Sequence, residues 1–314
     1  MSPDRLLPQA LACGLLAAAL ALPAVAAPVT FWTGVSGSTQ LYHTSAVPGQ
    51  PTQTVQDSHI QTIYPQGAND PLRGTDLATQ QHSELPAYGL SADAGAQAQM
   101  GVLKAFAQTR FNGTQGRDAH QGASAAAWST FGDTIAVTGD GLAPGTAVTY
   151  TVDIDVHGLF EQVTQLTNYA YAGADLVVQA QDVDSLRAES FSWRPAPTGT
   201  PPTGLAGGSY RWSYQTTVGR SFVLSAMLNA VAQNYSFLNG SVTADLGHTV
   251  HIALDNADAR LNTVGLSGHD FRLGGGAGPT PVPAPASAAL VLLGLALAAR
   301  QRAARCSQRT SSSR

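Results

Sequence analysis

The strongest constraint on the fold is the stretch of residues 148–157, in which apolar and polar side chains alternate without interruption. The apolar set is Val148, Tyr150, Val152, Ile154 and Val156, and the polar set is Thr149, Thr151, Asp153, Asp155 and His157. Because successive side chains of a strand point to opposite faces, this pattern predicts a half-buried antiparallel strand with one face in the core and one in water. The β-branched residues of the stretch strengthen this prediction.

Further stretches with strand character, separated by turn residues, lie on both sides of this one. They cover residues 100–108, 123–130, 133–138, 164–180, 186–193, 210–218, 222–231, 235–246, 250–254 and 261–273. A short helix over 96–110 is the competing interpretation of the first, and 195–208 is expected to be an exposed loop. Many short strands at near-regular spacing predict an all-β, antiparallel, jelly-roll-like β-sandwich over residues 96–273.

Residues 27–95 are polar, rich in Gln, Thr and Pro, and contain no long apolar run. Five prolines interrupt them, namely Pro48, Pro51, Pro65, Pro71 and Pro86. Because proline lacks the backbone donor that a ladder needs, we expect irregular structure with short strands here, the first opening at Phe31 and Trp32.

The amino terminus has the parts of a secretory signal peptide. Arg5 precedes an apolar stretch over 11–22, and small residues at 24–26 form a cleavage site. We therefore expect residues 1–26 to be a signal peptide that is removed on export.

Both cysteines of the chain, Cys13 and Cys306, lie in its end segments. The predicted body, residues 27–273, therefore has no cysteine, which excludes disulfides, thiol catalysis and cysteine-ligated metals there. A lipoprotein signal at Cys13 is an alternative, disfavoured because this residue comes before the apolar stretch has run its length.

The carboxyl terminus combines a Gly/Pro linker with a proline motif (274–285), an apolar segment with a basic stop (286–305) and a polar tail (306–314). The motif is Val282, Pro283, Ala284 and Pro285, and the stop is Arg300, Arg302 and Arg305. The apolar run before the stop has 14 residues, fewer than the roughly 20 of a spanning helix, so we expect a marginal transmembrane helix. The prolines keep the motif extended, and the arginines favour a cytoplasmic location for the far end.

This three-part order resembles the PEP-CTERM sorting signal of Gram-negative bacteria, whose motif has Glu where this chain has Ala284. The resemblance implies an exported protein of the cell envelope, outer surface or extracellular matrix. It also implies a transient membrane anchor and a partner, an exosortase-type membrane processing enzyme. An uncleaved membrane anchor is the alternative interpretation, and the basic cluster disfavours a eukaryotic lipid-anchor signal.

A looser resemblance extends over residues 101–273, which are similar to the bodies of many PEP-CTERM proteins. It rests on an Ala-rich strand pair, the Asp-x-Ile-x-Val strand, and a late strand before the Ser267-Gly268 turn. That strand reads Ala244-Asp245-Leu246-Gly247-His248-Thr249-Val250. This second resemblance implies a sandwich but no chemistry.

Charge narrows the range of partners. The body holds 19 acidic and 10 basic residues, a net charge near −9. Nucleic-acid binding needs a basic face that neutralises phosphates, so this composition argues against it and suits a soluble surface protein.

Paired carboxylates are the first candidates for chemistry. Asp153 and Asp155 are expected on one strand face about 6.6 Å apart, within the range of an inverting glycosidase pair. Asp182 and Asp184 repeat the spacing. We favour a solvated acidic face, whose charges resist edge pairing.

Metal sites have little support in the sequence. His248 and His251 lie three residues apart, which places them on opposite faces of a strand. A turn rich in oxygen ligands, formed by Asp255, Asn256 and Asp258, could hold Ca²⁺, but such residues are also ordinary turn material. No metal or other cofactor is predicted.

Trp128, Trp193 and Trp212 would form a carbohydrate platform if exposed, but each lies in a predicted strand, where the core is the expected place. The sequence therefore predicts a non-enzymatic structural or adhesive protein, with exopolysaccharide as a possible partner. The alternative is a carbohydrate-binding or glycan-hydrolysing β-sandwich module.

Overall fold

A computed structural model of the chain describes residues 30–45, 52–66, 70, 72–112, 119–164, 170–195, 204–235, 239–255 and 258–272. All of them belong to one compact unit, Met1–Leu273. The predicted signal peptide, sorting motif and basic stop lie outside the described residues. In the described ranges there is no helix with the length and apolarity that a membrane crossing requires.

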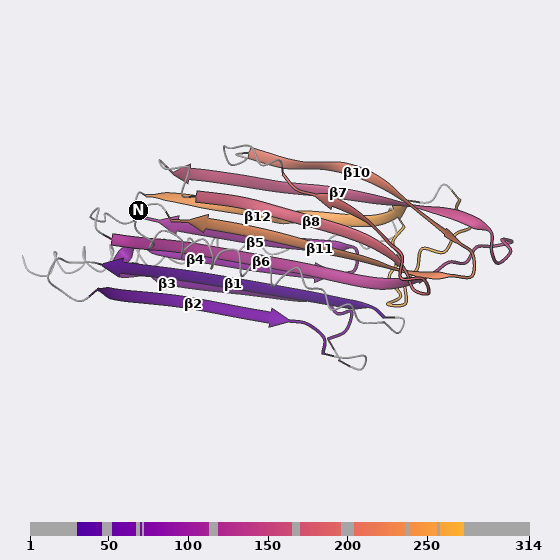
Figure 1. Ribbon diagram of the computed structural model, residues 1–314, viewed down its shortest axis with the longest axis horizontal. Helices are drawn as coiled ribbons and strands as arrows, with labels where there is room; N and C mark the ends of the chain where they lie inside the picture. Colours follow the sequence, from indigo (N-terminus) through magenta and orange to yellow (C-terminus); the bar gives the residue numbers. More distant parts are fainter. Residues whose placement is uncertain are drawn as a thin grey trace, which may run out of the picture. The chain divides into compact units, whose positions relative to one another are not determined.

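The described chain consists of twelve strands and one short 3-10 helix, η2 (Pro86–Tyr88) (Figure 1). The strands are β1 (Trp32–Ser45), β2 (Gln53–Ile63), β3 (Leu77–Leu85), β4 (Leu90–Gln99), β5 (Val102–Phe111), β6 (Ala119–Ala136), β7 (Ala147–Thr164), β8 (Ala170–Asp182), β9 (Ala188–Trp193), β10 (Gly204–Thr217), β11 (Ser221–Asn234) and β12 (Gly240–Asp255).

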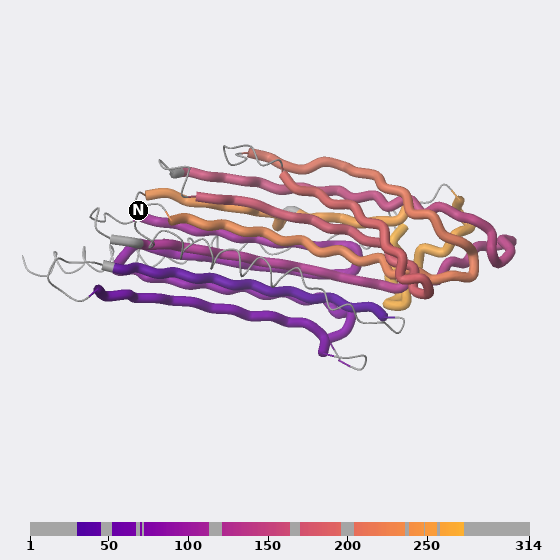
Figure 2. The backbone as a smooth tube through the Cα atoms, in the orientation of Figure 1, coloured from indigo at the N-terminus to yellow at the C-terminus, as the bar shows by residue number. Residues whose placement is uncertain are grey.

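These strands form two antiparallel six-stranded sheets. Sheet A has the order β2-β1-β6-β11-β8-β9, and sheet B has the order β10-β7-β12-β5-β4-β3. The sheets pack face to face, with β1 against β4, β6 against β5, β11 against β12 and β8 against β7. Figure 2 shows that the strands of both sheets lie along roughly the same axis. The predicted antiparallel β-sandwich is thus confirmed.

The last eight strands are nested pairs. β8 pairs with β9, β7 with β10, β6 with β11 and β5 with β12, so a single long antiparallel ribbon is rolled up into two sheets. This is the strand order of a jelly roll. Two additional hairpins widen it, because β1–β2 extends sheet A beyond β6 and β3–β4 extends sheet B beyond β5.

The alternating stretch of residues 148–157 lies in β7 and has the predicted orientation. Tyr150, Val152, Ile154 and Val156 are fully buried, while the side chains between them are partly or fully exposed. In the core, Phe222 of β11 contacts the rings of Tyr150 and Tyr214 at centroid distances of 5.0 Å each. The shared core therefore fixes the register of both sheets.

The expectation of irregular structure before residue 96 was wrong. β1 to β4 are regular strands of 9 to 14 residues and belong to the same two sheets as the rest. The five prolines fall between strands, not inside them; Pro86, for example, opens η2 directly after β3. Pro65 follows β2, and Pro48, Pro51 and Pro71 lie outside the described residues.

Two further details differ from the sequence prediction. The stretch 96–110 is a pair of strands, not a helix, because Gly101 with φ +74° turns the chain between β4 and β5. β10 begins at Gly204, earlier than expected, and its ladder with β7 accommodates Gly207 and Gly208 at positive φ. The rest of the predicted loop, residues 196–203, lies outside the described residues.

Candidate functional site

The carboxylate pair of β7 lies on the outer face of its sheet. Asp153 and Asp155 face outward from sheet B as predicted. The guanidinium of Arg211 donates to the Asp153 carboxylate at 2.7 and 3.3 Å and to Asp255 at 3.2 Å. Asp153 is thus held in a surface ion-pair network, which supports the structural interpretation.

Asp182 and Asp184 also have separate roles. Asp182 is buried and its carboxylate accepts hydrogen bonds from the Ser185 backbone at 2.7 Å, the Ser185 hydroxyl at 2.8 Å and Arg220 at 3.2 Å. Burial opposes ionisation, but these hydrogen bonds outweigh it and lower the pKa of Asp182. Asp184 is exposed, so the two form no site.

Two of the three candidate Ca²⁺ ligands, Asp255 and Asp258, bind arginine side chains. Asp255 contacts Arg211, and Arg260 donates to both oxygens of Asp258, lowering the Asp258 pKa to about 2. Asn256 and the His248 side chain lie outside the described residues. Among the residues that the structure describes, no three His, Cys, Asp or Glu side chains are placed to hold a metal ion.

One buried carboxylate escaped the sequence analysis. Asp133 of β6 is fully buried, and burial raises its pKa although the Ser267 hydroxyl donates to it at 2.5 Å. Gly265 approaches it so closely that a β-carbon there would overlap the carboxylate. Asp133 therefore anchors the closing segment, residues 258–272, to sheet A.

The three candidate tryptophans have different environments. Trp193 is buried, as expected, and Trp212 is half-buried against the core. Trp128 instead faces away from the core, because its neighbours Ala127 and Ser129 hold the buried positions of β6. The expectation that Trp128 belongs to the core was wrong.

Trp128 lines a groove of about 1230 Å³ on the outer face of sheet A. The groove crosses all six strands of sheet A, and its lining also contains Trp193 and three tyrosines, Tyr42, Tyr171 and Tyr235. Small residues, among them Ser38, Ala126 and Gly173, form the floor of the groove between the aromatic side chains. The volume exceeds the roughly 300–1,000 Å³ of small-molecule pockets, so the groove has room for an extended ligand.

Several aromatic rings on this face pack directly over glycine residues. Tyr42 of β1 is the cross-strand partner of Gly122 of β6. A β-carbon on Gly122 would lie 2.5 Å from ring atoms of both Tyr42 and Tyr235, whose centroids are 6.5 Å apart. The two rings therefore occupy the space above Gly122 that any other residue would fill.

The same arrangement recurs at three other places on sheet A. Trp32 covers its cross-strand partner Gly132, and Tyr171 covers Gly173 two residues along its own strand. Tyr64 covers Gly34, with the ring atom nearest the missing β-carbon at 2.5 Å. Rings packed over glycine in this way compensate for the absent side chain and hold the aromatic group against the sheet.

Polar groups accompany the rings. Asn229 flanks Trp128 on the next strand and pairs in turn with Asp175, whose carboxylate binds Arg194. Gln40 and Gln233 add amides to the lining. Burial raises the pKa values of Tyr42, Tyr171 and Tyr235, so their phenols stay neutral hydrogen-bond donors near pH 7.

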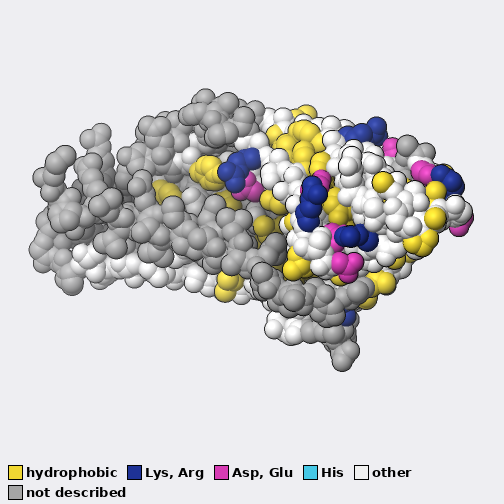
Figure 3. All heavy atoms as spheres, turned by 45° about the vertical axis from the view of Figure 1, so that its right-hand side comes forward, with side chains coloured by type: hydrophobic (Ala, Val, Ile, Leu, Met, Phe, Trp, Pro, Cys, Tyr) yellow, Lys and Arg dark blue, Asp and Glu magenta, His cyan; other side chains and the backbone are white. Residues whose placement is uncertain are grey.

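Charge is distributed differently outside the groove. Among the described outward-facing residues of β1, β6, β11 and β8, Asp175 is the single Asp, Glu, Lys or Arg. Figure 3 shows a face on which basic and acidic side chains lie next to one another and do not separate into patches of one sign. The groove lining holds one acidic and one basic side chain, Asp175 and Arg194, which pair with each other.

No protein-family model, no curated protein and no solved structure matches the chain.

Proposed function

We propose that the protein is an exported surface or matrix protein that binds polysaccharide in the groove of sheet A and does not catalyse a reaction. The observation that carries this proposal is the set of aromatic rings held over glycines along an amide-bearing groove whose one acidic and one basic residue pair with each other. The C–H faces of sugar rings stack on aromatic side chains, and sugar hydroxyls pair with amides and phenols.

The spacing of the rings favours a chain over a single sugar. Gly122, which seats Tyr42 and Tyr235, lies six residues before Trp128 on β6. Six residues of strand cover about 20 Å. A polysaccharide running along the strands would contact both aromatic positions, with the small floor residues between them. The scarcity of charge favours a neutral polysaccharide.

The lining favours binding over hydrolysis. Glycoside hydrolysis generally requires two carboxyl groups that flank the scissile bond. Asp175 is the single carboxylate among the described lining residues, and Arg194 is bound to it. The alternative of a glycan-hydrolysing module therefore has less support than the binding module.

The proposal of export rests on the two ends of the sequence. A signal peptide over residues 1–26 would direct the chain out of the cytoplasm, and the Val282-Pro283-Ala284-Pro285 motif would be presented to an exosortase-type enzyme. Arg300, Arg302 and Arg305 would hold the apolar segment in the membrane until processing. Mass spectrometry of the carboxy-terminal peptide in a host with an exosortase tests this. We expect a terminus near the motif; an intact Arg314 would leave an uncleaved anchor.

Binding is tested by affinity electrophoresis of the exported protein in gels that contain neutral or acidic polysaccharides. We expect retardation by a neutral polysaccharide, and at least tenfold weaker retardation for Trp128→Ala. Phe106→Ala, on the outer face of sheet B, is the matched control and should bind normally. Equal loss in both variants, or no retardation in any gel, would contradict the proposal.

A further inference from the structure

The sandwich has four edge strands among its described residues: β2 and β9 in sheet A, β3 and β10 in sheet B. Exposed edges invite pairing with another chain unless they are short, charged, bulged or covered. β9 has only six residues and carries Glu189. β10 carries Arg211 and two consecutive glycines with positive φ. These two edges have the usual protection.

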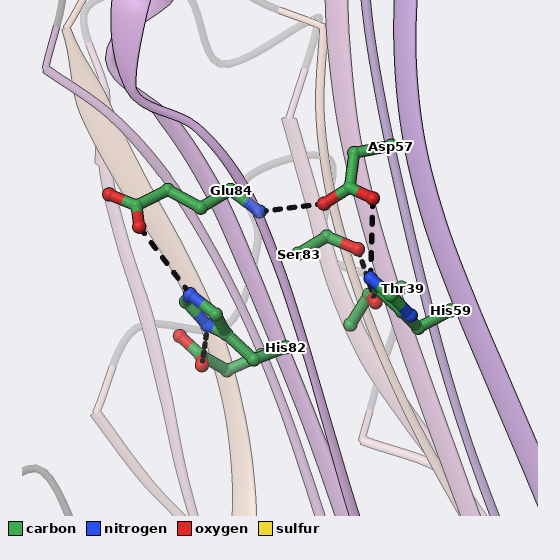
Figure 4. Close-up of polar contacts among 7 residues, drawn as sticks. Thr39, Asp57, His59, His82, Ser83 and Glu84 are labelled. Carbon is green, nitrogen blue, oxygen red and sulfur yellow. Dashed lines mark hydrogen bonds and ion pairs between the residues drawn. The ribbon is translucent and has the colours of Figure 1, made fainter.

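The edge of β3 is covered from across the sandwich. The Asp57 carboxylate of β2 accepts a hydrogen bond from the Glu84 backbone at 3.0 Å, and Figure 4 shows this contact beside the Asp57–His59 pair. Gln61 of β2 accepts hydrogen bonds from the Thr79 hydroxyl at 2.7 Å and the Gln81 amide at 2.9 Å. β2 thus protects β3 while its own outer edge stays unpaired in the described structure.

β2 has fewer of these protections, since its one carboxylate, Asp57, is turned towards the Glu84 backbone of β3. It pairs with β1 over all eleven residues without a bulge, and it contains no proline, lysine or arginine. Most of its residues are exposed on both faces, including Ile60, whose side chain is 72% accessible. Figure 1 shows β2 at the outer border of its sheet, with no labelled strand beyond it.

We infer that β2 pairs antiparallel with β2 of a second copy of this chain, about a two-fold axis at Ser58. Two of the five residue pairs about this axis are complementary, and the other three place an amide opposite an aliphatic side chain. Asp57 then faces His59 of the other copy, twice by symmetry, and Thr54 faces Thr62. Opposite-charge and Thr–Thr pairs directly across an antiparallel ladder stabilise it, and a symmetric dimer requires a self-complementary surface.

The dimer joins two copies of sheet A into one continuous sheet. Because β2 also lines the polysaccharide groove with Ser58 and Ile60, the two grooves lie on the same face of that sheet. The pairing itself depends on the edge alone and stands whether or not the groove binds sugar.

Disulfide trapping tests the register in the full chain with Cys13 and Cys306 replaced by serine. Ser58→Cys should form a dimer on mild oxidation, because residues facing each other in an antiparallel pair lie about 4.5–5.5 Å apart, within disulfide range. Thr54→Cys alone or Thr62→Cys alone should not form a dimer, because the same residue in the second chain then lies about 27 Å away. A mixture of these two variants should cross-link. Equal trapping in all single variants, or none for Ser58→Cys, would overturn the inference.

Exchanging the charged residues Asp57 and His59 tests the position of the two-fold axis without introducing cysteine. His59→Asp places Asp opposite Asp57 twice and should raise the dimer dissociation constant about tenfold in sedimentation experiments. The double variant Asp57→His with His59→Asp restores opposite partners and should recover most of the affinity. Leu205→Lys, at the 92% exposed position of the β10 edge, should have no effect. A dimer disrupted by Leu205→Lys but not by His59→Asp, or a chain that stays monomeric, would contradict the proposed axis.

Discussion

The outer faces of the two sheets cover the same core but differ in composition. The face of sheet A carries aromatic rings seated over Gly122, Gly132 and Gly173, with amides and hydroxyls between them. The face of sheet B carries Asp153 and Asp155 and the network in which Arg211 joins Asp153 to Asp255. Ordinary solvation explains the second face, since charge on an exposed sheet favours solubility and resists edge pairing.

Solvation does not explain the first face. Glycine weakens a strand interior by roughly 0.5–1 kcal/mol relative to alanine, and half-exposed aromatic rings add no burial to the core. The rings packed over these glycines offset part of that cost and leave aromatic surface facing outward. The difference between the sheets supports the proposal that sheet A carries the binding surface.

The largest effect is expected from the core that both faces share. Ile154→Asp should unfold the protein, because burying an unpaired carboxylate costs several kcal/mol against a total stability of roughly 5–15 kcal/mol. Loss of the β-type far-ultraviolet circular dichroism spectrum would be the measurement. If Ile154→Asp stays folded and still binds polysaccharide, sheet A does not depend on this core.

Alkaline pH should weaken the same core. Burial raises the pKa of Tyr150 to about 12, so folding favours the neutral phenol. This contribution to the free energy of unfolding is fully present below pH 10, the ordinary pKa of tyrosine. It is lost as the pH rises towards about 12, the pKa of Tyr150 in the folded protein. The loss is roughly 3 kcal/mol. Denaturant melts between pH 9 and 12 should show it, and Tyr150→Phe should reduce the pH dependence. An unchanged slope in that variant would exclude Tyr150 as the source.

A matched pair of glycine variants separates the two faces. Gly122→Ala must displace the rings of Tyr42 and Tyr235, and we expect about tenfold weaker polysaccharide binding, or ~1.4 kcal/mol, with a small change in melting temperature. Gly95→Ala on the outer face of sheet B meets only the Thr79 carbonyl oxygen at 3.6 Å and should leave binding intact. Equal binding by both variants would show that the seated rings do not make the site.

The smallest effect should come from the charged face. Asp153→Ala removes an exposed ion pair, which contributes about 0–1 kcal/mol, and binding should be unchanged. Thermal melts and affinity electrophoresis are the measurements. Loss of sugar binding in a folded Asp153→Ala protein would move the site to sheet B.

The fold was predictable wherever side-chain alternation was strong. The pattern of residues 148–157 determines its own orientation, and the spacing of turns beyond residue 100 indicates the sandwich. Residues 27–95 differ from the prediction because proline content alone does not distinguish a proline inside a strand from one between strands. In the structure these prolines separate strands that alternate with small or polar residues, such as Ser91 and Ala92, in place of large apolar ones.

The candidate site was predictable only in part. Trp128 stood out as a possible platform residue, but its direction depends on which face of β6 is buried, and the surrounding Ala and Ser residues do not reveal this. The pairing of Tyr42 with Gly122 depends on the β1–β6 register across eighty residues of chain. Local sequence contains no signal for such a register.

The most direct test is oxidative footprinting of the aromatic side chains with and without bound polysaccharide, read out by mass spectrometry. The account predicts protection of Tyr42, Trp128, Tyr171 and Tyr235, and unchanged oxidation of Phe106 on the outer face of sheet B. Protection of Phe106 with no change at Trp128, or no protection at any of these residues under conditions where the polysaccharide binds, would contradict it.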